Sequence, residues 1–127
     1  MPDPDQYRIE ISPRPRFIAE QSDPDNGRFV FAYTISIRNA GSGPAQLVSR
    51  HWIITDADGE VQEVRGVGVV GEQPLLQPGE SFEYTSGCVL PTPLGTMKGS
   101  YRMVAGDGTS FDAAIPEFVL AMPRVLH

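Results

Sequence analysis

The amino-acid sequence predicts an all-β domain in which about seven antiparallel strands form a sandwich or a small barrel. The strongest observation is the segment from Arg28 to Arg38, where large apolar residues alternate strictly with smaller or polar ones. A second observation is the content of 13 glycines and 12 prolines in 127 residues, most of which lie between apolar runs. No window has the apolar period of a helix, so strands are expected to form the core.

The first three expected strands span residues 7–12, 28–38 and 46–55. Apolar and polar residues alternate in the first, and the second carries five large apolar side chains on one face. The third is apolar on both faces, which is typical of a central strand or of a strand with one face against a partner. Its Trp52 is expected to be a large core residue or an anchor at an interface.

The remaining strands span residues 61–65, 82–90, 97–103 and 111–120. Asp56–Gly59 precedes the first of these and Ala105–Gly108 precedes the last. Both segments are typical of tight hairpin turns, in which glycine supplies a positive φ. Prolines are expected in loops or at strand ends, where a missing N–H costs least.

The composition restricts the class of protein. The net charge of −6 disfavours nucleic-acid binding, and 40% hydrophobic residues favour a folded domain, which the length fits as one unit over 1–127. The single cysteine, Cys88, excludes an internal disulfide, and no apolar run is long enough to insert into a membrane. Because the N-terminus lacks the features of a secretory signal, we expect a cytoplasmic protein.

The sequence Gly66-Val67-Gly68-Val69-Val70-Gly71 has the glycine spacing of a dinucleotide-binding loop. Such a loop opens a helix, yet two prolines follow within the next eight residues and prevent a helix of useful length. We therefore interpret the segment as a mobile or strand-capping glycine loop. The alternative is that backbone N–H groups around Gly66, Gly68 and Gly71 bind a phosphate-bearing small molecule, a nucleotide or pyrophosphate, without a helix.

No constellation of residues predicts catalysis or a bound metal. Ser49 and His51 share one strand face, but the sequence identifies neither an orienting acid nor an oxyanion hole for them. A metal site would need His51, Cys88 and the terminal His127 together, or acidic turns that lack the closing glutamate of a calcium loop. We expect no catalytic residue, no metal site and no cofactor.

Several segments together carry a resemblance to a known family. They are Phe31–Ile35, Ser49–Asp56, Glu63–Pro74, Pro78–Glu80, Tyr84–Gly87, Gly95–Gly99 and Ile115–Leu120. Through them nearly the whole chain resembles the bacterial ApaG family, also called CorD. The resemblance implies an immunoglobulin-like, fibronectin type III-like β-sandwich and a genetic association with cobalt resistance and magnesium efflux. It implies no established reaction, and similar domains in larger eukaryotic proteins are thought to mediate protein–protein contacts.

The leading hypothesis is a non-enzymatic module that binds a protein partner. The expected binding surface comprises Arg50, Trp52, Arg65 and the Gly66–Gly71 loop, since arginine can hold a carboxylate bidentately. We expect a monomer or a weak homodimer that binds neither nucleic acid nor membrane. Two alternatives remain open: binding of a phosphate-bearing molecule at the glycine loop, and direct sensing of Mg²⁺ or Co²⁺ by acidic loops.

Overall fold

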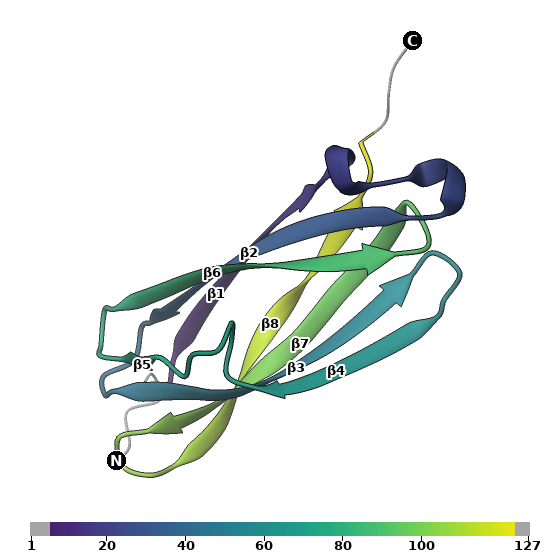
Figure 1. The fold of residues 1–127 in the computed structure, drawn as a ribbon. Helices are drawn as coiled ribbons and strands as arrows, with labels where there is room; N and C mark the ends of the chain where they lie inside the picture. The colour runs from purple at the N-terminus through teal and green to yellow at the C-terminus, as the bar shows by residue number, and fades with distance from the viewer. Residues whose placement is uncertain (1–5, 124–127) are drawn as a thin grey trace.

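The computed structural model describes residues 6–123, whose strands form two antiparallel sheets (Figure 1). The smaller sheet has the order β1-β2-β6, with β1 (Ile9–Phe17), β2 (Phe29–Asn39) and β6 (Ser81–Leu90). The larger sheet has the order β4-β3-β7-β8, with β4 (Val61–Val67), β3 (Ala45–Asp56), β7 (Leu94–Ala105) and β8 (Ser110–Ala121). The short β5 (Leu75–Leu76) also pairs with β3, and two 3₁₀ turns, η1 (Ala19–Gln21) and η2 (Pro24–Asn26), connect β1 to β2. The architecture confirms the predicted all-β sandwich.

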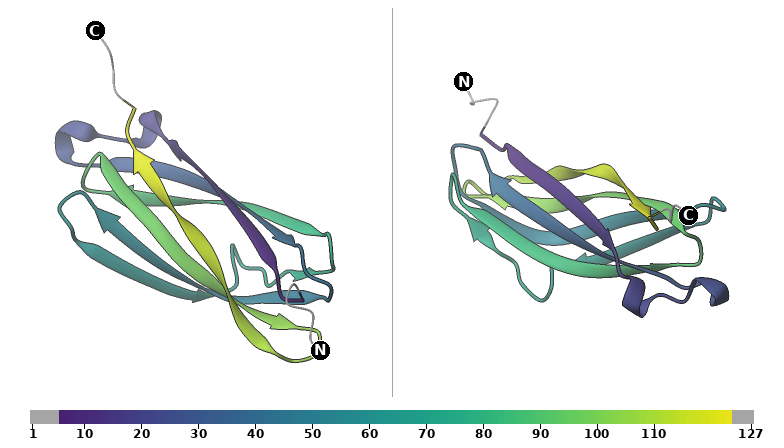
Figure 2. Two further views of the ribbon diagram at one scale, coloured as in Figure 1. Left: turned by 180° about the vertical axis from the view of Figure 1, so that it is seen from behind. Right: turned by 90° about the horizontal axis from the view of Figure 1, so that it is seen from above.

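The core lies between the two sheets, which Figure 2 shows as two layers seen from above. The residues on the predicted apolar face of β2 are all at most 7% exposed: Phe29, Phe31, Tyr33, Ile35 and Ile37. Trp52 of β3 is 2% exposed, and its ring meets those of Tyr33 and Phe118 edge-on at centroid distances of 5.3 and 5.9 Å. Of the two expectations for Trp52, the structure shows the core residue.

All seven predicted strands are present, and β5 is an eighth strand that the sequence did not predict. The first strand differs most, because it begins at Ile9 rather than Tyr7 and continues through Pro13 and Pro15. The expectation that prolines occupy only loops and strand ends was therefore wrong, and Pro116 also lies inside β8. Both β1 and β8 are edge strands. On the free side of an edge strand a backbone N–H has no partner in a neighbouring strand, so a proline there costs no hydrogen bond.

A β-bulge in β3 explains why this strand is apolar on both faces in the sequence. Its pairing with β7 shifts between Leu47 and Ser49, so the alternation of faces changes phase there. Leu47 is fully buried together with Trp52, although simple parity grouped it with Ser49 and His51. Beyond the bulge, Arg50 and Trp52 lie on the inner face of the sheet, and Ser49 and His51 lie on the outer face.

The two predicted hairpin turns are confirmed, with φ of +82° at Gly59 and +86° at Gly108. In the first turn, Asp56 Oδ1 accepts the backbone N–H groups of Asp58 at 2.9 Å and Glu60 at 3.1 Å. The carboxylate of Asp56 therefore stabilises the turn in which it lies. No helix within residues 6–123 has the length and apolar character needed to cross a membrane.

Candidate functional site

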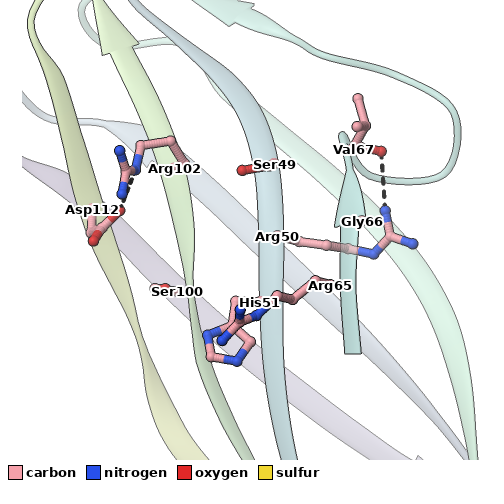
Figure 3. Close-up of a pocket in the computed structure, with 9 residues that line it drawn as sticks. All are labelled: Ser49, Arg50, His51, Arg65, Gly66, Val67, Ser100, Arg102 and Asp112. Atoms are coloured by element: carbon pink, nitrogen blue, oxygen red, sulfur yellow. Dashed lines mark hydrogen bonds and ion pairs between the residues drawn. The ribbon is translucent and has the colours of Figure 1, made fainter. Parts of the chain in front are cut away.

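A broad pocket of about 680 Å³ opens on the outer face of the larger sheet (Figure 3). It is lined by Ser49, Arg50, His51, Arg65, Gly66, Val67, Ser100, Arg102 and Asp112. Strand pairing gathers these residues, because His51 lies opposite Arg65 on β4 and opposite Ser100 on β7. The side chains at the centre of the pocket are therefore held by four neighbouring strands.

Two lining residues, Arg102 and Asp112, form an ion pair with each other, and His51 and Arg65 both contact Glu63 beside the pocket. His51 Nε2 lies 3.1 Å from Glu63 Oε1, and Arg65 Nη2 lies 4.0 Å from the same oxygen. Arg102 Nε donates to Asp112 Oδ1 at 2.7 Å. The Arg65 side chain is 71% exposed and its contact with Glu63 is long, so its guanidinium stays accessible to a binding partner.

The pocket does not assemble a catalytic triad or a metal centre. Ser49 and His51 share the outer face as predicted, but no hydrogen bond joins them in the described part of the chain, and His51 contacts Glu63 instead. Within residues 6–123, no group of three or more His, Cys, Asp or Glu could hold a metal ion. Burial raises the pKa of Cys88 to about 11, which keeps it a weakly reactive thiol. His127 lies outside the described residues.

Of the mobile or strand-capping loop expected for the glycine-rich segment, the structure shows the end of a strand followed by a turn. Gly66 belongs to β4, whereas Val69 and Glu72 close a two-residue turn through N–H···O bonds of 2.8 and 2.9 Å. Gly68 N–H donates to the carbonyl of Val48 at 2.8 Å. The Gly68 N–H is therefore not free to bind a phosphate, and within residues 6–123 no helix follows the segment, so it lacks the helix N-terminus of a dinucleotide-binding loop.

The Arg50 side chain, from β3, forms hydrogen bonds at the end of β4. It lies opposite Gly66, where an added Cβ would come within 2.6 Å of the guanidinium carbon, so the glycine leaves space for this side chain. Its Nη1 donates to the carbonyl of Val67 at 3.1 Å, as Figure 3 shows, and to that of Gly68 at 2.8 Å. The structure thus brings Arg50, Gly66 and Gly68 together, while the Trp52 side chain is buried in the core on the same face of β3 as Arg50.

The turn holds a valine in a strained backbone conformation. Val70 has a φ of +44° and Gly71 a φ of +81°. A β-branched residue is rare in this left-handed region, because its Cβ crowds the backbone carbonyl. Val67, Val70 and Leu75 are 74, 57 and 57% exposed, and we call these three residues the apolar tip. Val67 and Val70 lie within the loop that the sequence placed in the binding surface, but Leu75 and the strain at Val70 were not predicted. The signal for the strain was a valine before Gly71, where such turns prefer asparagine.

Replacing Val70 by asparagine is expected to stabilise the protein. Asn-Gly is the preferred pair for a two-residue turn with both φ values positive, and asparagine enters the left-handed region at lower cost. We expect the free energy of unfolding to rise by about 1 kcal/mol in urea denaturation. Val67→Asn is the matched control, since Val67 is exposed in β4 without a positive φ. Equal effects of the two changes would argue against strain at Val70.

The fold and the site define a small antiparallel β-sandwich that presents an accessible arginine beside exposed apolar side chains. Residues 19–105 match the ApaG domain. The chain is 71% identical to Protein ApaG of Dechloromonas aromatica over 127 residues, which covers 100% of both chains. It is 67% identical to Protein ApaG of Thiobacillus denitrificans over 122 residues, 96% of both. The chain therefore belongs to the ApaG family.

A solved structure of similar sequence has the same fold. The chain superimposes on a crystal structure of a protein from Bordetella pertussis with a TM-score of 0.93 and 60% sequence identity. The superposition covers 95% of this chain and 98% of the other.

Proposed function

We propose that this protein is a non-enzymatic module that binds a protein partner through Arg65 and the apolar tip. The observation that carries the proposal is their proximity, since Arg65 and the 74% exposed Val67 are two residues apart on the outer face of β4. Exposed apolar side chains beside an accessible arginine are typical of interaction surfaces. The strain at Val70 supports a functional role, because strained conformations concentrate at functional sites.

The chemistry of this surface suggests the character of the partner. Arg65 would bind a carboxylate, in competition with its weak contact to Glu63, while the apolar tip would be covered by aliphatic or aromatic side chains. We propose that any effect on cobalt resistance or magnesium efflux acts through this partner rather than through ions bound to the chain. The Asp56 carboxylate supports an indirect effect, because its Oδ1 accepts two backbone N–H groups of its own turn and is not reserved for an ion.

Arg65→Ala is expected to abolish capture of the partner while leaving the fold intact. The side chain is 71% exposed and makes only a 4.0 Å contact, so its removal should barely change the free energy of unfolding. The measurement is affinity capture from a bacterial lysate, with thermal melts of each variant. Arg16→Ala is the matched control, because Arg16 is exposed on β1 in the opposite sheet. Equal capture by both variants, or capture no better than by an unrelated acidic protein, would contradict the proposal.

A further inference from the structure

The sandwich is closed along one side and open along the other. The strands β1 and β8 pack against each other at the closed side. At the opposite side, a pocket of about 400 Å³ opens between the edges of β4 and β6. Arg50 is the one charged residue that lines it, and Trp52, Val64 and Cys88 supply apolar surface. Apart from Arg50, which lines both pockets, the β3 residues of this inner pocket lie on the face opposite to those of the outer pocket.

The guanidinium of Arg50 has no anion as a neighbour. Within residues 6–123 it forms no ion pair, and Nη1 is its only nitrogen that donates a hydrogen bond to the protein. Three buried tyrosines, Tyr33, Tyr84 and Tyr101, lie within its electrostatic reach, but burial raises their pKa values, that of Tyr84 to about 12. These phenols are therefore neutral at physiological pH, and the charge of the half-buried Arg50 is left uncompensated.

A second unsatisfied donor belongs to a residue that lines the same pocket. Trp52 is 2% exposed, and its Nε1 is the one buried side-chain nitrogen or oxygen among the described residues without a hydrogen-bond partner. Leaving such a donor unpaired costs about 1–3 kcal/mol, so it is unusual in a native core. Because Nε1 is itself covered, an acceptor reaches it only when a lining side chain shifts. Arg50 and Gln62 are the long flexible side chains of the pocket.

We propose that the pocket between β4 and β6 binds a small monocarboxylate with an apolar body, held by Arg50 and Trp52. The guanidinium matches the two oxygens of a carboxylate through donors that the protein leaves free. Trp52 Nε1 supplies a further neutral donor, and the apolar walls accept the body of the ligand. One guanidinium balances a single negative charge, whereas a phosphate dianion would need a second cation that the lining does not contain. Arg50 lines both this pocket and the outer pocket, but the carboxylate site includes neither Arg65 nor the apolar tip.

The single tryptophan of the chain makes the test direct. Trp52 fluorescence of the full chain is recorded during titration with hexanoate, with hexanamide as the uncharged control and inorganic phosphate as the dianion. We expect a saturable change with hexanoate and a dissociation constant on the order of 1 mM, as befits a small ligand held by few groups. Neither hexanamide nor phosphate should give a saturable change.

Two variants connect the response to the pocket. Arg50→Gln is expected to weaken hexanoate binding at least about tenfold, because a charged hydrogen bond is lost. Gln62→Glu places a negative charge on the pocket wall at an exposed position, and it should weaken binding to a similar degree without loss of fold. Arg65→Gln is the matched control on the outer face and should bind like the native chain.

Other results would overturn the proposal. A hexanoate response that is absent, not saturable, or equally strong with hexanamide would show that the pocket has no carboxylate site. Tighter binding of phosphate than of hexanoate would show that the single charge of Arg50 does not select a monoanion. If Arg50→Gln fails to fold, Gln62→Glu decides the question alone, and unchanged hexanoate binding by that variant counts against the site.

Discussion

Gly99→Ala is expected to lower the free energy of unfolding by about 3 kcal/mol. Gly99 lies in β7 directly opposite Trp52 of β3, and an added Cβ would overlap the backbone carbonyl oxygen of His51. No side-chain rotation can relieve an overlap with backbone, so β3 and β7 must move apart. Both strands are central in the larger sheet, and their separation would also loosen the packing around Trp52.

Chemical denaturation and thermal melts measure this effect, with a fall in Tm of about 10 °C expected for a domain of this size. Gly87→Ala is the matched control, because Gly87 also lies inside a strand and its added Cβ would meet only Phe31 O, at an ordinary 3.5 Å. The control should change stability by less than about 0.5 kcal/mol. Similar stabilities of the two variants would mean that β3 and β7 do not approach as closely as the structure has them.

The parts of the fold that the sequence predicted best are those in which burial follows from local alternation. The expected strand over residues 28–38 and the observed β2 (Phe29–Asn39) differ by one residue at each end, because every second side chain is large and apolar. The hairpin turns at Gly59 and Gly108 were predictable for a similar reason, since a positive φ strongly favours glycine. In such segments local chemistry alone determines the structure.

Features that depend on pairing between strands were not predictable in this way. The bulge in β3 inserts one residue into its ladder with β7, and parity counting then places Leu47 on the wrong face. The contact between Arg50 and Gly66 depends on the register of β3 and β4, which no local pattern reveals. The turn at Val70 was not predicted because valine disfavours the left-handed conformation that it adopts there. Such conflicts between a residue and its conformation are expected mainly at functional or strained sites.

Asn39→Ala is expected to lower the free energy of unfolding by about 3 kcal/mol, through lost hydrogen bonds rather than a clash. Asn39 is 1% exposed at the end of β2. Its Nδ2 donates to the carbonyls of Gly43 and Leu76, both at 2.9 Å, and its Oδ1 accepts the N–H of Gly41 at 2.9 Å. The side chain therefore joins the β2–β3 loop to β5, and alanine would remove all three of these hydrogen bonds.

Asn26→Ala provides the comparison, because Asn26 also donates its amide to a neighbour, Asp23 Oδ2 at 2.7 Å, but does so at an exposed site where water can replace the bond. Its loss should change the free energy of unfolding by less than about 0.5 kcal/mol. Hydrogen exchange adds a local measurement, since the Gly41 amide should exchange faster in Asn39→Ala than in the native chain. Unchanged exchange at Gly41, with equal stability of the two variants, would contradict a structural role for the Asn39 side chain. The predicted difference rests on burial, because Asn39 is 1% exposed and its bond to Leu76 is buried, whereas the bond of Asn26 to Asp23 is exposed.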